Sequence, residues 1–341
     1  MSEKSIVVGI THGDINGIGY EVIIKTLSDS RIMEVCTPVL YGSSKVASFH
    51  KKLVKSCGDF SFRPIQKPED ANGKAPNILN ITNSEFKIDI GTSTNIAGEA
   101  ALTSLEMATD HLIKGKINVL VTAPINKDNI NSEAFSFPGH TEYLAKKFNS
   151  EDYLMLMIAD GLRIGTLTTH CAISDLPKMI KRETLLNKLK ILNTSLQQDF
   201  LCTKPKIAVL SLNPHAGDNG MFGKEEKNII IPAIQEAFNS GLYVFGPYSA
   251  DGFFGMGQHT QFDGVLAMYH DQAMIPFKIL SYGEGVNYTA GLPFIRTSPA
   301  HGTAYEIAGK DKANPNSFRK AIYTACDIYR NRKESKNNSE F

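Results

Sequence analysis

The sequence predicts an α/β protein of two lobes with a mixed, mostly parallel sheet. Two observations lead to this fold class. Apolar, strand-like runs alternate along the chain with segments of helical periodicity, a pattern typical of parallel strands joined by helices. The chain of 341 residues also exceeds the usual size of a single hydrophobic core. We therefore expect two lobes.

Each element follows from a local pattern. Apolar runs that are expected to form buried parallel strands lie at 6–10, 37–42, 117–124, 206–212 and 264–269. Helical periodicity predicts helices at 95–114, 175–198, 224–239 and 315–331. Asp160-Gly161 stands between two alternating runs, which favours a hairpin and hence an antiparallel excursion in the sheet. The polar, proline-containing segment 58–93 is expected to be rich in loops.

Charge and composition argue against several classes of partner. Lys plus Arg number 36 and Asp plus Glu number 35, so no net field attracts nucleic acid or an anionic membrane. We see no signal-like segment and no apolar run long enough for a membrane span, and we expect a cytoplasmic protein. The 5 cysteines form no CxxC pair, which indicates reduced, mostly structural thiols.

Three histidines each follow a mostly apolar strand: His170, His215 and His270. Ligands of open α/β sheets collect just beyond the carboxyl ends of the strands. Three imidazoles at such ends can hold one ion such as Zn²⁺ and leave a position for a substrate. A histidine at a strand end is also a common core or capping residue, so each of the three has a purely structural interpretation as well.

The stretch from 270 to 310 predicts a cleft for an anionic ligand. It places charged and polar side chains between glycines and short apolar segments: His270, Asp271, Lys278, Asn287, Arg296 and His301. Such donors suit an anionic substrate and the phosphates of a cofactor. A second candidate segment opens a helix at His140-Thr141-Glu142, although Thr141 is also explained as a helix cap.

The turn after the first strand, THGDINGIGYE, is rich in glycine but is not a nucleotide fingerprint. It matches neither GxGxxG nor the P-loop, which requires a Lys-Ser/Thr pair. Backbone geometry alone explains glycines in such a turn.

Two resemblances to known families extend this interpretation. HGTAYEIAGKDKANP resembles the loop with which isocitrate and isopropylmalate dehydrogenases hold the adenosine end of NAD. The ordered motifs GDINGIGYE, VTAPINK, FPGHTEYLA, TTHCAISDLP, LNPHAGDNGMFGKEE, AMYHDQ and GVNYTAGLPFIRTSPAHGTA resemble the 4-hydroxythreonine-4-phosphate dehydrogenase family over about residues 5 to 330. One departure is visible, because the opening reads GDINGIGYE where the family has GDPAGIGPE. This removes two prolines but no side-chain ligand.

The resemblance implies a two-lobed α/β/α fold like that of isocitrate and isopropylmalate dehydrogenases, with the active site in the cleft between the lobes. We expect residues 1–130 plus 271–341 to form the cofactor-side lobe, and 131–270 to form the lobe for metal, substrate and dimerisation. The implied ligands of one divalent ion are His170, His215 and His270, and those of the substrate are His140, Thr141, Lys278, Asn287 and Arg296. We assign the cofactor to Gly291, Leu292, His301, Gly302 and Thr303.

The implied reaction is NAD-dependent oxidation of 4-phosphooxy-L-threonine at its 3-hydroxyl, with decarboxylation to 3-amino-2-oxopropyl phosphate, in pyridoxal 5'-phosphate biosynthesis. The ion would be zinc, or alternatively magnesium, cobalt or manganese, and the choice between NAD and NADP stays open. Lys278 and Asp271 are candidates to relay the alcohol proton, although Lys278 is equally explained as a fixed cation. In this family a homodimer completes the metal site from both subunits.

Three alternatives remain open at this point. A related enzyme would oxidise another phosphorylated hydroxy acid, of the threonate or erythronate 4-phosphate type. A metal-dependent hydrolase would use the same histidines to activate water. A small-ligand binding protein would show affinity without turnover.

Overall fold

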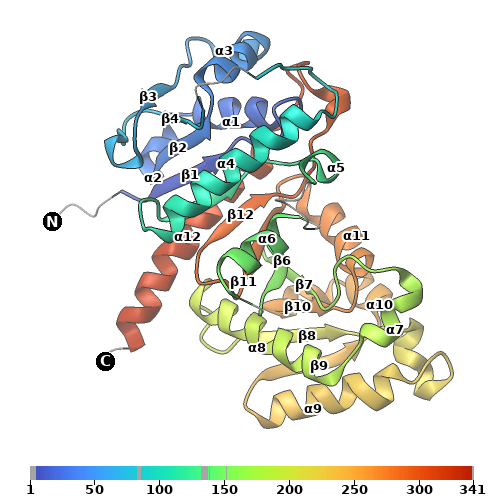
Figure 1. Ribbon diagram of the computed structural model, residues 1–341. Coiled ribbons are helices and arrows are strands. Elements are labelled where there is room, and N and C mark those ends of the chain that lie inside the picture. Colours follow the sequence, from blue (N-terminus) through green and yellow to red (C-terminus); the bar gives the residue numbers. More distant parts are fainter. Residues whose placement is uncertain (1–4, 83–85, 132–136, 138, 151, 340–341) are drawn as a thin grey trace. The chain divides into compact units, whose positions relative to one another are not determined.

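The computed structural model describes the chain from Ser5 to Ser339, except for residues 83–85, 132–136, 138 and 151 (Figure 1). The chain forms two compact units: unit 1 is Met1–Leu144 with Phe294–Tyr329, and unit 2 is Ala145–Pro293 with Arg330–Phe341. The division therefore falls at other positions than the expected 130 and 270. Residues 286–290 form a strand that pairs inside unit 2, which places the segment before Pro293 in that unit.

Unit 1 contains a sheet in which every neighbouring pair of strands is parallel. Its spatial order is β3 (Arg63–Ile65), β4 (Asn77–Asn80), β2 (Thr37–Gly42), β1 (Val7–Thr11), β5 (Val119–Thr122) and β12 (Arg296–Pro299). All residues of β2 and β5 are buried, as expected for parallel strands covered on both faces. The strands β3 and β4 lie in the segment expected to be rich in loops. They are short, which explains why no periodicity marked them.

The helices of unit 1 begin at polar caps where the sequence provides them. Ser43 and Thr94 accept hydrogen bonds from backbone N–H groups at the starts of α3 and α4. The predicted helix at 95–114 is confirmed as α4, which packs against β1, β2 and β5 (Figure 1). The helices that lie in unit 1 or begin there are α1 (Gly19–Leu27), α2 (Arg31–Val35), α3 (Ser44–Leu53), α4 (Asn95–Ile113), α5 (Lys127–Ile130), α6 (His140–Lys147) and α12 (Asn316–Ser339). Short 3-10 turns lie at η1 (Lys55–Cys57), η2 (Pro68–Asp70) and η7 (Tyr305–Ile307).

Unit 2 contains a mixed sheet. Its spatial order is β11 (Val286–Ala290), β6 (Leu154–Ala159), β7 (Leu162–Thr166), β10 (Gly264–Ala267), β8 (Lys206–Leu210) and β9 (Tyr243–Tyr248). The predicted hairpin is confirmed, because β6 and β7 pair antiparallel on either side of Asp160-Gly161. β6 also pairs antiparallel with β11, whereas β7, β10, β8 and β9 are parallel.

The helices of unit 2 depart from the predictions in three places. The predicted helix 175–198 is interrupted between α7 (Leu176–Met179) and α8 (Arg182–Gln198), and the one at 224–239 starts as a π-turn, η5 (Glu226–Ile230), before α9 (Ile231–Asn239). The loop-like stretch 270–310 contains α11 (His270–Ser281) and the strands β11 and β12. The remaining elements are η3 (Ile173–Asp175), η4 (Pro214–Gly220), α10 (Ala250–Gly255) and η6 (Gln258–Gln261). A search of the described residues finds no helix that is long and apolar enough to cross a membrane.

Candidate active site

The three predicted metal ligands follow neighbouring parallel strands of unit 2. His170 comes after β7, His270 after β10 and His215 after β8, and these strands are adjacent in the order β7-β10-β8. Because they are parallel, their carboxyl ends meet at one edge of the sheet. The histidines thus leave the sheet where the strand pattern predicted. Metal binding by them stays a prediction.

His170 and His270 lie together. Their ring centres are 6.2 Å apart, and the planes of the two rings are inclined by 35°. Both rings line a cavity of about 240 Å³ that is also lined by Cys171, Tyr269 and Asp271. Nδ1 of His270 lies 2.7 Å from Oδ1 of Asp271, so Nε2 is the ring nitrogen left for a ligand. A carboxylate in this position orients a ligating imidazole.

His215 belongs to a strained turn. It begins a run of six residues with positive φ, from 52° at His215 to 100° at Gly220. Left-handed backbone costs roughly 1–2 kcal/mol for each residue with a Cβ. Buried Glu226 holds the approach to this turn, since its Oε1 accepts from the backbone N–H groups of Leu212 and Asn213, both at 2.8 Å. Such strain persists only where the surroundings fix it, and it is common at functional sites.

His215 does not join the other two histidines within the chain. Its ring instead lies 6.2 Å from that of Phe222. Over the residues that the structure describes, no three His, Cys, Asp or Glu side chains are grouped so as to hold a metal ion. One chain therefore offers two close imidazoles and a third on a separate turn.

Unit 1 contributes a buried arginine and a half-buried histidine from the predicted substrate set. Arg296 begins β12 and is 2% exposed, and its Nε and Nη2 donate to Oγ1 of Thr122 at 3.0 and 2.6 Å. Burial lowers the pKa of Arg296 to about 9, a shift that the charge of Glu142 opposes. Burial, together with the charges of Arg296 and Lys127, holds the pKa of His140 well below its usual range. Its imidazole is therefore neutral at physiological pH.

Several predicted site residues carry buried polar atoms without a hydrogen-bond partner in the described part of the chain. These atoms are Nε2 of His140, Oδ1 of Asn287 and Nε2 of His301. Buried polar groups are almost always paired, so an unpaired one calls for a ligand or an ordered water. Thr141 follows His140 in the first turn of α6, and Lys278 is exposed on α11. Asp271 is engaged by His270, which favours an orienting role over proton relay.

The predicted cofactor residues fall into two groups. His301, Gly302 and Thr303 lie in unit 1 directly after β12, and burial lowers the pKa of His301. Gly291 and Leu292 lie in unit 2, where they line a cavity of about 560 Å³. That cavity is also lined by Asp199 and Arg332, an ion pair with a 2.6 Å Nε to Oδ1 distance.

Asp14 and Glu226 are structurally important residues that sequence reasoning did not single out. Asp14 is 1% exposed, and its Oδ2 accepts from Nδ2 of Asn129 and from the hydroxyl of Tyr305, both at 2.7 Å. A carboxylate inside a glycine-rich turn was the available signal for Asp14. Glu226 gave none, because its partners are backbone groups that only the folded turn brings near.

Comparison with known proteins identifies the family of this chain. The sequence model of the family described as "Pyridoxal phosphate biosynthetic protein PdxA" matches residues 34–325. A 4-hydroxythreonine-4-phosphate dehydrogenase from Bacteroides thetaiotaomicron is 50% identical over 337 residues, covering 98% of this chain and 92% of the relative. A D-threonate 4-phosphate dehydrogenase from Pectobacterium atrosepticum is 36% identical, covering 95% and 99%.

A solved structure gives the same result. The 4-hydroxythreonine-4-phosphate dehydrogenase from Klebsiella pneumoniae superposes with a TM-score of 0.83 at 33% identity, over 96% of this chain and 99% of that one. The family match covers well over half of the chain, and the relatives are aligned over nearly their whole lengths. This chain belongs to the PdxA family of pyridoxal phosphate biosynthetic proteins.

Proposed function

We propose that this protein oxidises 4-phosphooxy-L-threonine with NAD, in a metal-dependent reaction that also releases CO₂ and yields 3-amino-2-oxopropyl phosphate. The observation that carries the proposal is the close pair of His170 and His270 at the strand ends of unit 2. Family membership and the names of the most similar relatives support the same reaction. NAD, when bound, accepts the hydride from the carbon that bears the alcohol.

His170 and His270 would hold the divalent ion, with zinc the preferred candidate for a site of imidazoles. When bound, such an ion lowers the pKa of the substrate hydroxyl and polarises the carbonyl that follows oxidation. Asp271 fixes the tautomer and orientation of His270 through its 2.7 Å contact with Nδ1. Nε2 of His270 is thereby the ring nitrogen left for the ion.

The substrate brings a phosphate and a carboxylate, and the chain supplies matching donors. Arg296 is held by Thr122 and carries its charge in a buried position, where an anion is bound more strongly than in water. Two buried atoms have no partner among the described residues: Nε2 of neutral His140, which can donate to an anion, and Oδ1 of Asn287, an amide oxygen that can accept from a hydroxyl or ammonium group of the substrate. Exposed Lys278 adds a fixed cation on α11. We propose that these groups bind the phosphorylated substrate.

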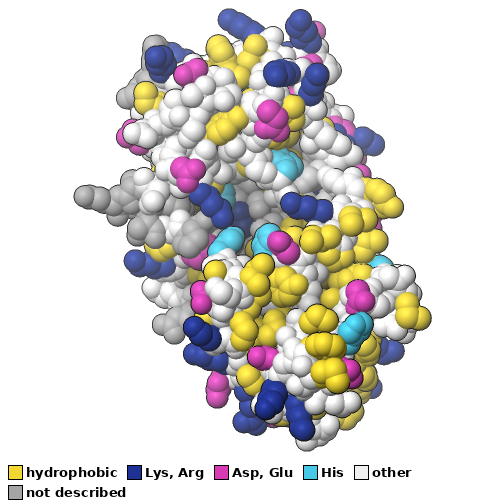
Figure 2. All heavy atoms as spheres, turned by 90° about the vertical axis from the view of Figure 1, so that its right-hand side faces the viewer, with side chains coloured by type: hydrophobic (Ala, Val, Ile, Leu, Met, Phe, Trp, Pro, Cys, Tyr) yellow, Lys and Arg dark blue, Asp and Glu magenta, His cyan; other side chains and the backbone are white. Residues whose placement is uncertain are grey.

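We further propose a homodimer that completes the metal site. Large apolar side chains are exposed beside each predicted ligand, with Ile173 at 78% after His170 and Met221 at 74% after His215. α11, which starts at His270, exposes Ile275 and Ile279 at 60 and 66%. Figure 2 shows hydrophobic side chains gathered on one face of the molecule. A second copy covering these residues would supply the third imidazole from His215 of the partner subunit.

The relative named for D-threonate 4-phosphate supports a second candidate substrate. Purified enzyme should be assayed by NADH absorbance with 4-phosphooxy-L-threonine, D-threonate 4-phosphate and D-erythronate 4-phosphate, each with added zinc, magnesium, cobalt or manganese. The highest kcat/KM identifies the substrate. Activity with threonate 4-phosphate alone would replace the proposed substrate, and release of phosphate without NAD would indicate the hydrolase instead.

A further inference from the structure

The glycine-rich turn at residues 12–19 and helix α1 hold one segment of unit 1, which we call the 301–313 loop. At the near end of this loop, the N–H of Ile18 donates to the carbonyl of Thr303 at 3.0 Å. A Cβ on Gly17 would lie 2.8 Å from the same carbonyl, so only glycine permits this approach. The hydroxyl of Tyr305 donates to Oδ2 of Asp14 at 2.7 Å. The turn therefore contacts the loop directly. Glycine at position 17 is needed for this close approach as well as for the turn.

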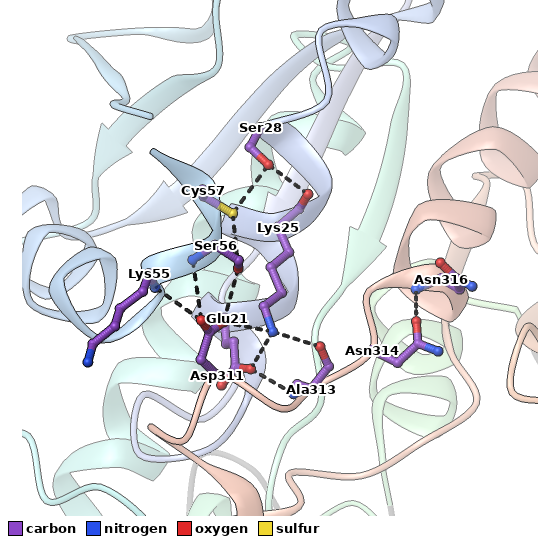
Figure 3. Close-up of polar contacts among 10 residues, drawn as sticks. All are labelled: Glu21, Lys25, Ser28, Lys55, Ser56, Cys57, Asp311, Ala313, Asn314 and Asn316. Carbon is purple, nitrogen blue, oxygen red and sulfur yellow. Dashed lines mark hydrogen bonds and ion pairs between the residues drawn. The ribbon is translucent and has the colours of Figure 1, made fainter. Parts of the chain in front are cut away.

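An ion pair on α1 holds the far end of the loop (Figure 3). Oε1 of Glu21 accepts from the N–H of Ala313 at 2.7 Å, and Nζ of Lys25 donates to the carbonyl of Ala313 at 3.0 Å. Glu21 and Lys25 pair with each other at 2.9 Å, one helical turn apart. Both side chains are largely buried, at 3 and 12% exposure. The backbone N–H and C=O of one loop residue, Ala313, thus both bind a single charged pair.

Asp311 extends this arrangement to a second segment. Its Oδ1 lies 2.9 Å from Nζ of Lys25, and its Oδ2 accepts from the N–H groups of Lys55 and Ser56 at the start of η1. The residue has a φ of 55°, a left-handed conformation that a non-glycine residue adopts only when it is held there. Both carboxylate oxygens of Asp311 are therefore engaged by the protein. Asp311 therefore holds the loop to Lys25 and η1, and we do not expect its carboxylate to bind a ligand.

The side chain of the loop that is available to bind a ligand is that of His301. Nε2 of His301 is buried and finds no partner among the described residues, while Nδ1 of the same ring lies 3.1 Å from the carbonyl of Gly302. The loop thus has one ring nitrogen, Nε2 of His301, without a partner among the described residues. The rest of the loop is held in place by contacts at Thr303, Tyr305, Asp311 and Ala313. A loop held in its bound conformation binds its ligand with less loss of conformational entropy.

We propose that Glu21, Lys25 and Asp311 are positioning residues that set the affinity for the dinucleotide by holding the 301–313 loop, without touching the dinucleotide themselves. The inference rests on the proposed function, in which this loop takes part in binding NAD. It assigns a role to the first helix of a chain whose first turn lacks the Rossmann and P-loop fingerprints.

The test compares Lys25→Met with a matched control, Lys114→Met. Lys114, the C-cap residue of α4 in unit 1, also pairs with an acidic residue four positions earlier, Asp110, but both side chains of that pair are exposed, at 58 and 51%. Lys25→Met leaves Glu21 and Asp311 without their shared cation. We expect the Kd and KM for NAD to rise about tenfold or more, as the loss of one charge-assisted bond predicts. The KM for the phosphorylated substrate and the kcat at saturating NAD should stay within about twofold of wild type.

Asp311→Asn provides a second variant if Lys25→Met does not fold, because asparagine tolerates left-handed backbone and keeps the side-chain shape. Calorimetric titration with NAD and thermal melting are measured on the same samples. A lower Tm with an unchanged Kd for NAD in both variants would overturn the inference and leave only a structural role. Wild-type protein that fails to bind NAD would instead overturn the proposed function, and the inference with it.

Discussion

Unit 1 buries its candidate substrate groups, whereas unit 2 leaves its candidate metal ligands near the surface. Arg296 is 2% exposed and its guanidinium is held by Thr122, while His170 and His215 are exposed. The buried groups of unit 1 are prepared by the chain's own packing, with His140 kept neutral by burial. The candidate metal ligands of unit 2 lie beside apolar side chains that are exposed to solvent in the single chain. The contrast indicates that a single chain orders the candidate substrate groups of unit 1 by its own packing, but not the candidate metal ligands of unit 2.

The largest expected effect comes from unit 2. His170→Ala and His270→Ala should each abolish bound divalent metal and lower kcat/KM by more than the 10–100-fold typical of groups that only support a ligand. Metal content by mass spectrometry and NADH formation measure the two losses. His259→Ala, a histidine of η6 in the same unit, is the control. Full metal content in either ligand variant would contradict the assignment.

Arg296→Met tests whether the buried arginine of unit 1 binds the substrate. The variant keeps most of the apolar stem but removes the charge that Thr122 orients. The KM for the phosphorylated substrate should rise about a hundredfold, while the KM for NAD changes little, because a charged hydrogen bond to the anion is lost. Arg31→Met, at an exposed arginine of unit 1, should leave both constants unchanged. An equal rise in both constants would argue against a substrate role.

Unit 1 should also lose stability in mild acid. His12 and His50 are buried and stack on either side of Tyr20, and burial lowers the pKa of each to about 4. The unfolded chain takes up these protons near pH 6.5, while the native state does not until about pH 4. Their contribution is therefore complete above pH 6.5 and is lost as pH falls toward 4, at up to about 1.4 kcal/mol per pH unit for each histidine.

Urea unfolding at pH 7.5, 6 and 5 measures this loss as a decrease in the free energy of unfolding. His50→Gln retains a donor for the carbonyl of Ile15, which His50 Nε2 contacts at 2.8 Å, but it cannot take up the proton. The variant should show a shallower dependence on pH than wild type. A slope as steep as that of wild type would assign the acid sensitivity to other groups.

Mixing two inactive variants tests whether a second copy completes unit 2. His215→Ala and His270→Ala, refolded together, should regain about a quarter of wild-type activity, because half of the dimers are mixed and each has one intact site. The same experiment with His170→Ala and His270→Ala should regain nothing, since those residues pair within one chain. Recovery in neither mixture, or a fully active monomer in sedimentation, would contradict the shared site.

The sequence predicted unit 1 and unit 2 with different success, for physical reasons. Buried parallel strands such as β2 and β5 are continuous apolar runs and are readily recognised. α11 was not recognised, because its buried residues Ala273, Met274 and Phe277 cover little more than one turn and Pro276 interrupts them. The division between the units was also misplaced, since the pairing of β11 with β6 joins segments more than a hundred residues apart.

Residue types in the sequence predicted more of the candidate site than the pattern of helices and strands did. Strand ends indicated the three histidines, and the buried unpaired atoms of His140, Asn287 and His301 fit residues already proposed from resemblance. The contacts that hold these residues in place could not be predicted from the sequence. Glu226 and the pair of Glu21 and Lys25 act through backbone groups that only the folded chain brings near, and no pattern in the sequence signals such contacts. Asp14 acts through the side chains of Asn129 and Tyr305, which are more than a hundred residues away in the sequence.

The left-handed turn at His215 has a consequence for how this sequence can vary among relatives. Glu226 accepts from Nδ2 of Asn213 at 2.9 Å, and a Cβ on Gly217 would lie 2.7 Å from its Oε2. Asn213, Gly217 and Glu226 therefore constrain one another although none is a proposed ligand. A Cβ at 217 is disfavoured by the positive φ as well as by Glu226, and a shorter residue at 226 releases the backbone before His215. Glycine at 217 and glutamate at 226 are therefore both needed wherever the histidine keeps this conformation.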